Sequence, residues 1–204
     1  ELDYDEEGTL FISSPTMTLG YYKNEEATNK IVYTDNQGNK WINTGDIFSI
    51  SSDGSLYFKG REKRIVVRPD GHNIPSNQIE SISNSFTEIK NSVVVGIPSK
   101  SYAHGSMAAV CISLKNELSQ NEKEELLKEI EKKSKKNLQP RDRAKYYVII
   151  EDIPYTSNGK VDYIKLTQYV DNEINKLSID ENAQEAYHII TNNKNDTKKK
   201  IRRK

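Results

Sequence analysis

The sequence has no run of apolar residues near the ~18–20 that a helix needs to cross a bilayer, and no signal-peptide pattern opens it. It has one cysteine, Cys111, so a disulfide within one chain is excluded and a reducing, cytoplasmic setting is expected. It also lacks net charge, because 30 Lys and Arg balance 30 Asp and Glu. This balance argues against wholesale nucleic-acid binding.

Familiar catalytic and metal-binding arrangements are missing as well. The three histidines lie far apart without metal-ligand spacing, so no metal site is expected. Cys111 lies in the apolar run 108–112, which favours a buried, inert thiol over a nucleophile. We find no nucleophile–base–acid set. The 204 residues begin with Glu rather than Met, and we expect a fragment of a longer protein.

Residues 1–60 are predicted to form a short β-rich subdomain. Strand-like runs at 8–12, 41–43, 47–50 and 56–58 are separated by turn signals such as Asn36-Gln37-Gly38 and Ser52-Asp53-Gly54. Residues 22–32 are predicted to be helical. The strands are too few to close a sheet alone, so we expect part of a distorted barrel whose other strands lie upstream.

Residues 61–178 are predicted to form a small α+β domain. A hairpin with a Pro69-Asp70-Gly71 turn comes first. Apolar runs at 93–97, 107–114 and 146–150 predict a three-stranded sheet, and helical periodicity predicts flanking helices at 76–86, 119–138 and 163–176. The whole chain is therefore assigned to the α+β class.

Residues 179–204 differ in composition from the rest. Residues 181–204 hold 7 Lys and Arg against 3 Asp and Glu, with almost nothing to bury. We expect a basic, disordered tail. A non-enzymatic binding module that uses this tail to contact nucleic acid or an acidic partner is one alternative function, and its affinity would fall steeply with salt.

Three polar motifs could carry chemistry. Thr44-Gly45-Asp46 places a carboxylate after a glycine, where it could accept hydrogen bonds from a ribose diol or simply satisfy the amides of a turn. The basic cluster 60–64 could bind a ligand or be a solvated linker. The loop 156–162 carries Lys160, which could reach a phosphate or carboxylate or be an exposed loop lysine.

Together these motifs resemble those of the adenylate-forming enzymes. Gly8-Thr9-Leu10-Phe11-Ile12 and Gly20-Tyr21-Tyr22 are similar to the family's "GELxIxG…GYxN" segment, and 41–46 to its "YxTGD" motif. Residues 60–63, with Gly71 and Ile79-Glu80, resemble "GRxDxxIKxxGxxIxPxEIE", and 156–162 resembles "PxTxxGKxxR". The four motifs occur in the family's order over roughly residues 8–178.

The resemblance implies that a carboxylic acid reacts with ATP to form an acyl-adenylate and then passes to a thiol. Asp46 would hold the ribose hydroxyls, Arg61 would support the same sugar, and Lys160 would stabilise the charge that develops during adenylation. Lys63 would be the hinge about which the small domain swings. Gly71 would leave room for the incoming thiol arm.

The same resemblance implies the ligands. ATP and Mg²⁺ would bind mainly to a large domain that this chain lacks, because the sequence has no phosphate loop. Coenzyme A is the expected thiol, which makes an acyl-CoA synthetase the leading prediction. An amino-acid-activating domain that loads a carrier-protein thiol is the second, although no carrier attachment segment follows residue 178. We expect no membrane span, no nucleic-acid partner and no activity from the fragment alone.

Overall fold

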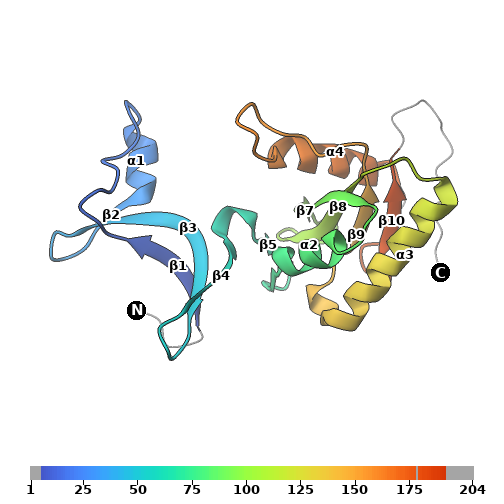
Figure 1. The fold of residues 1–204 in the computed structure, drawn as a ribbon, viewed down its shortest axis with the longest axis horizontal. Helices are drawn as coiled ribbons and strands as arrows, with labels where there is room; N and C mark the ends of the chain where they lie inside the picture. The colour runs from blue at the N-terminus through green and yellow to red at the C-terminus, as the bar shows by residue number, and fades with distance from the viewer. Residues whose placement is uncertain (1–5, 178, 192–204) are drawn as a thin grey trace. The chain divides into compact units, whose positions relative to one another are not determined.

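The computed structural model describes residues 6–177 and 179–191. The chain divides into two compact units, Glu1–Arg64 and Ile65–Lys204 (Figure 1). The sequence placed this boundary between residues 60 and 61, four residues earlier. The mixed α and β fold class is confirmed, since helices and sheets occur in the same chain.

The first unit is an antiparallel sheet built around one long strand. That strand, β3 (Lys40–Ile50), pairs with β1 (Glu7–Ile12), β2 (Val32–Thr34) and β4 (Leu56–Arg61). The unit also contains helix α1 (Glu25–Ile31) and the 3-10 turn η1 (Glu62–Arg64). Its described strands form an open sheet rather than a closed barrel.

Few side chains of the first unit are buried. Among its described residues, Ser49 alone is buried, at 6% exposure. Large apolar side chains are exposed instead: Phe11, Ile12, Leu19, Tyr21, Tyr22, Tyr33, Leu56, Tyr57 and Phe58. Because burial of apolar surface is the main driving force of folding, this sheet has little core of its own.

The second unit has a four-stranded sheet with helices on both faces. The strand order is β10-β9-β8-β7, and β7 and β8 are antiparallel whereas β8, β9 and β10 are parallel. The strands are β7 (Ile89–Pro98), β8 (Ser106–Leu114), β9 (Tyr146–Ile149) and β10 (Tyr187–Ile190). The helices are α2 (Ser76–Asn84), α3 (Gln120–Asn137) and α4 (Tyr163–Asn175), with a 3-10 turn η2 (Pro140–Asp142).

Strand side chains alternate between two cores. On one face Val94, Val110 and Tyr147 pack with Ile79 of α2 and with Leu127 and Ile130 of α3. On the other face Val95, Cys111 and Val148 pack with the buried stripe of α4, Leu166, Val170 and Ile174. The period of two along each strand therefore builds a three-layer unit.

A short hairpin precedes this sheet. Strands β5 (Val66–Val67) and β6 (Asn73–Ile74) pair antiparallel across the predicted turn. Arg68 N donates to His72 O at 2.9 Å, and Gly71 lies at φ +81° inside the turn. A glycine suits this position because an L side chain rarely adopts that φ.

The prediction of three sheet strands is wrong, because β10 adds a fourth. Residues 179–191 were assigned to a disordered tail, yet Tyr187 and Ile189 are 8% and 7% exposed against the core that α4 covers. The strand was missed because its four residues stand among polar ones and its pairing partner, β9, lies 41 positions earlier. The remaining tail, 192–204, lies outside the described residues, so the structure does not test the predicted binding role of this tail.

No helix among the described residues is both long and apolar enough to cross a membrane.

Candidate functional site

The Thr44-Gly45-Asp46 and Gly60-Arg61 motifs meet on neighbouring strands of the first unit. Asp46 and Arg61 are paired positions in the β3–β4 register. Arg61 Nε lies 2.7 Å from Asp46 Oδ1, and the two side chains are 57% and 23% exposed respectively. The Ser51–Ser55 turn, with Gly54 at φ +84°, joins the two strands, and a register shift between Ile47 and Phe48 brings Asp46 opposite Arg61.

The backbone before Asp46 is held by its own side chains. Thr44 Oγ1 donates to Leu10 O of β1 at 2.9 Å and accepts from Asp46 N at 3.1 Å. Asn43 Oδ1 accepts from Gly45 N at 2.6 Å, and Gly45 has φ +68°. Residues 44–46 lie inside strand β3 rather than in a turn between two strands. The Gly45 and Asp46 amides are bonded to Asn43 and Thr44, and the Asp46 carboxylate pairs with Arg61.

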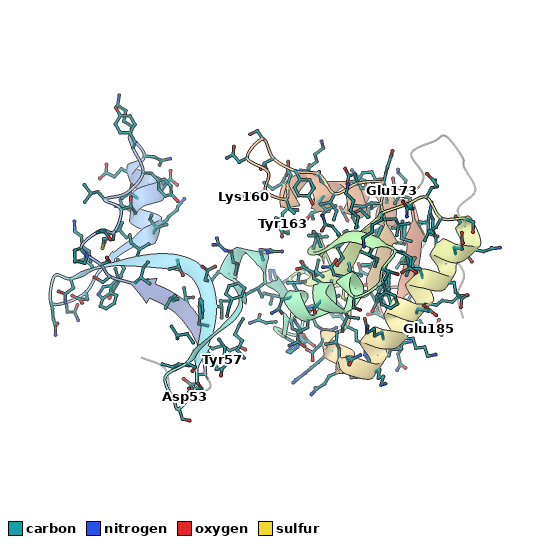
Figure 2. All side chains as sticks on the ribbon, in the orientation of Figure 1. Asp53, Tyr57, Lys160, Tyr163, Glu173 and Glu185 are labelled. Carbon is teal, nitrogen blue, oxygen red and sulfur yellow. The ribbon has the colours of Figure 1, made fainter. Side chains whose placement is uncertain are left out.

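Lys160 lies in a closed loop before α4 (Figure 2). Thr156 N donates to Lys160 O at 2.7 Å, Lys160 N donates to Thr156 Oγ1 at 3.3 Å, and Gly159 N donates to Thr156 O at 2.9 Å. Gly159 has φ +74°, and an isolated bridge joins Tyr155 to Val161. The side chain of Lys160 is exposed, so a hydrogen-bonded loop presents one solvated ammonium group.

Asp162 ends this loop and begins α4. Its side chain accepts from Lys165 N at 3.0 Å and so caps the helix. Here the carboxylate has a structural use, since an N-cap acceptor satisfies an otherwise free helix amide.

The hairpin that carries Gly71 is joined to η2 by a histidine–carboxylate contact. His72 Nε2 lies 2.5 Å from Asp142 Oδ1, with both side chains about three-quarters or more buried at 26% and 19% exposure. Arg68 Nε lies 3.4 Å from Asp70 Oδ1 within the turn. The sequence did not predict this contact, because the two residues lie 70 positions apart.

Lys63 lies within η1, at the end of the first unit. Gly71 and Lys160 both belong to the second unit, and Asp46 and Arg61 to the first. The structure therefore brings Asp46 and Arg61 together, while the other three predicted residues lie in separate segments. Cys111 is fully buried, and burial raises the pKa of its thiol far above the ordinary value. An inert Cys111 follows, as predicted.

Comparisons with known proteins found a matching family and similar folds. Residues 78–160 match the family described as the AMP-binding enzyme C-terminal domain. The anthranilate CoA ligase AuaEII, solved with anthranoyl-AMP, has the same fold with a TM-score of 0.69 at 21% identity, over 86% of this chain and 32% of that one. Residues 78–160, which lie within the second unit, are thus similar to the C-terminal domain of AMP-binding enzymes.

The sequence is also similar to parts of two proteins named as ligases. The chain is 29% identical over 154 residues to the medium/long-chain-fatty-acid–acyl-carrier-protein ligase FadD10 of Mycobacterium tuberculosis, covering 76% of this chain and 27% of the relative. It is 28% identical over 162 residues to the 4-coumarate–CoA ligase-like protein 4 of Oryza sativa subsp. japonica, covering 78% and 27%. The chain thus spans about a quarter of the length of these relatives.

Proposed function

We propose that this chain is the C-terminal part of an ATP-dependent ligase that activates a carboxylic acid as an acyl-adenylate and transfers the acyl group to a thiol, coenzyme A in the first instance. In the first half-reaction a carboxylate oxygen bonds to the α-phosphorus of ATP and pyrophosphate leaves. In the second, the thiol sulfur bonds to the acyl carbon and AMP leaves.

The Asp46–Arg61 pair carries this proposal. Asp46 and Arg61, 15 positions apart, meet at 2.7 Å because the β3–β4 register, with its shift between Ile47 and Phe48, pairs them. A carboxylate can accept hydrogen bonds from the two hydroxyls of a ribose, and the neighbouring guanidinium both orients it and adds donors. We assign ribose binding to Asp46 and support of the same sugar to Arg61.

Lys160 is the proposed catalytic residue of adenylation. Its ammonium group stands at the end of a closed, hydrogen-bonded loop, which limits the entropy lost when the loop meets a substrate. There it would face the α-phosphate and carboxylate oxygens, whose negative charge grows in the transition state. Preorganised positive charge at such a point is commonly the largest contribution to catalysis.

Lys63 and Gly71 are assigned to the thiol-transfer step. The division of the chain falls after Arg64, one residue beyond Lys63, which supports a hinge at Lys63. Nothing lies within 4 Å of the position that a Cβ would take on Gly71, so its hairpin turn presents bare backbone. A narrow thiol arm such as pantetheine fits against such a surface. Rotation about the hinge would exchange Lys160 for this turn.

Among the described residues, no group of three or more His, Cys, Asp or Glu side chains could hold a metal ion. We propose that Mg²⁺, and most contacts to ATP, belong to a large domain outside the given sequence. The exposed apolar side chains of the first unit, Phe11 and Phe58 among them, support a covering domain there.

The acceptor has two candidates. Coenzyme A is favoured by relatives named as CoA ligases, such as the Oryza protein. A carrier-protein thiol is favoured by the relatives FadD10 and the fatty acid–acyl-carrier-protein ligase MmaC of Mycobacterium marinum. Coenzyme A and the carrier protein carry the same pantetheine arm. The two acceptors are therefore distinguished by supplying each in turn and measuring thioester formation.

The test uses the parent protein, by which we mean the longer ligase that is proposed to contain this chain. It measures carboxylic-acid-dependent exchange between ATP and pyrophosphate over a panel of acids. We expect exchange with at least one acid and a loss of roughly 100-fold or more in Lys160→Ala. Lys165→Ala is the matched control, since Lys165 is also exposed and lies on the first turn of α4. Absence of exchange with every acid, or equal losses in the two variants, would overturn the proposal.

A further inference from the structure

The segment that follows α4 forms an ordered part of the small domain's fold. We define residues 179–191 as the C-terminal strap; it lies beyond the matched residues 78–160. Its strand β10 pairs in parallel with β9, and Tyr187 N donates to Lys145 O at 2.9 Å. Lys145 Nζ in turn donates to Glu185 O at 2.9 Å. The strap is therefore bonded to the sheet at several points.

Glu181 fastens the strap to the loop between β7 and β8. Glu181 is 8% exposed, and its carboxylate accepts from Ser99 Oγ at 2.8 Å, from Lys100 N at 2.9 Å and from Ser101 N at 3.0 Å. Burial acts to raise the pKa of Glu181, but these hydrogen bonds outweigh it and hold the pKa below its ordinary value. An ionised carboxylate thus accepts from three successive residues of one loop.

The same loop presses on the hairpin that carries Gly71. Ser99 N donates to Gly105 O at 3.1 Å, which closes the loop over residues 99–105. A Cβ on Gly105 would lie 2.5 Å from Pro69 N and 2.7 Å from Arg68 C, so the two backbones are in direct contact. Pro69, Tyr102 and Glu181 also line one cleft. The strap thus contacts the loop, and the loop in turn contacts the hairpin turn.

We propose that Glu181 is a positioning residue for thiol transfer: it fixes loop 99–105, which through Gly105 fixes the hairpin turn at Gly71. This inference rests on the proposed function, because it takes that turn as the surface the thiol approaches. Glu181 acts through the loop and touches no reactant. The Lys160 loop is closed by its own hydrogen bonds to Thr156, and we expect adenylation to be unaffected by this connection.

The substitution that tests it is Glu181→Gln. A glutamine keeps the size of the side chain but turns one acceptor oxygen into a donor, which would face N–H groups of the loop. Glu185→Gln is the matched control: it makes the same chemical change four residues along the strap, at an exposed side chain. Ser99→Ala is a milder second variant that removes one donor to Glu181 and leaves its charge.

The first measurement needs no activity. In the 204-residue chain, hydrogen exchange of the amides of residues 68–74 should become at least ~10-fold faster in Glu181→Gln and less so in Ser99→Ala. Amides of α4 should exchange as before, which separates a local effect from general unfolding. Unchanged exchange of the hairpin in both variants, or equal acceleration in Glu185→Gln, would overturn the proposal.

The second measurement uses the parent protein. Glu181→Gln should raise the KM for the acceptor thiol about 10-fold, while ATP–pyrophosphate exchange stays within about twofold of the unsubstituted protein. Equal losses in both half-reactions would contradict a positioning role. If the parent protein shows no acid-dependent exchange at all, the proposed function fails, and the exchange rates of the hairpin amides still decide whether the strap positions it.

Discussion

Gly105→Ala should destabilise the small domain more than a comparable glycine substitution elsewhere in it. Gly105 and Gly159 both have positive φ, +88° and +74°, so alanine at either costs about 1–2 kcal/mol in backbone energy. The surroundings differ. At Gly159 nothing lies within 4 Å of the new methyl group, whereas at Gly105 it would lie 2.5 Å from Pro69 N.

The overlap at Gly105 adds the cost of moving a backbone. Pro69 N and Pro69 Cα, at 2.5 and 2.6 Å, cannot rotate away as a flexible side chain could. Overpacking of this kind costs a further ~1–3 kcal/mol. At 1.36 kcal/mol for each factor of ten, opening of the small domain should be about 5- to 150-fold more frequent in Gly105→Ala than in Gly159→Ala.

The chain contains its own probe for this opening. Cys111 is the sole cysteine, and it is fully buried between β7 and β9, so a thiol reagent reaches it when the small domain opens. The rate of labelling by such a reagent therefore reports the free energy of opening. The single tryptophan, Trp41, lies in the other unit and its emission should stay unchanged. Equal labelling rates in the two alanine variants would refute the close contact between Gly105 and Pro69.

Two further predictions concern ionisable groups of the small domain. Contact with His188, at 2.9 Å, is the main reason that the pKa of Glu131 is lowered from 4.5 to about 2. The ionised carboxylate thus stabilises the folded state above pH 4.5, and this stabilisation is lost as the pH falls toward 2. Allowing for solvent screening, we expect it to contribute about 1 kcal/mol to the free energy of unfolding. In urea unfolding, the stability of Glu131→Gln should therefore depend less on acid pH than that of the unsubstituted chain. Asp162→Ala removes the N-cap of α4 and should lower the free energy of unfolding by about 1 kcal/mol, measured against the exposed Asp152→Ala; an unchanged urea midpoint would contradict the capping role.

Local signals predicted most of the second unit. Helix α3 was expected at 119–138 and occupies Gln120–Asn137, because Ser119 and Glu122 form a capping box and the helix buries a regular stripe that includes Leu126 and Ile130. The hairpin turn at Gly71 was likewise readable, since Pro, Asp and Gly each favour such a turn. These features depend on residues a few positions apart.

Features that depend on distant partners were not predicted. Strand β10 is selected by the edge of β9, and Glu181 by a loop 80 residues earlier. Asp46 and Arg61 were each singled out from their motifs, but their 2.7 Å contact follows from the β3–β4 register. Composition averaged over residues 179–204 concealed a buried segment next to a basic one, which is why the tail was extended too far.

The central claim is that Lys160 serves the first half-reaction and leaves the second to other residues. The most direct test supplies the parent protein with a preformed acyl-adenylate and the acceptor thiol, and compares Lys160→Ala with the unsubstituted protein. The account predicts thioester formation within about threefold of the unsubstituted rate, although acid-dependent ATP–pyrophosphate exchange is lost. Equal loss of both half-reactions would contradict it.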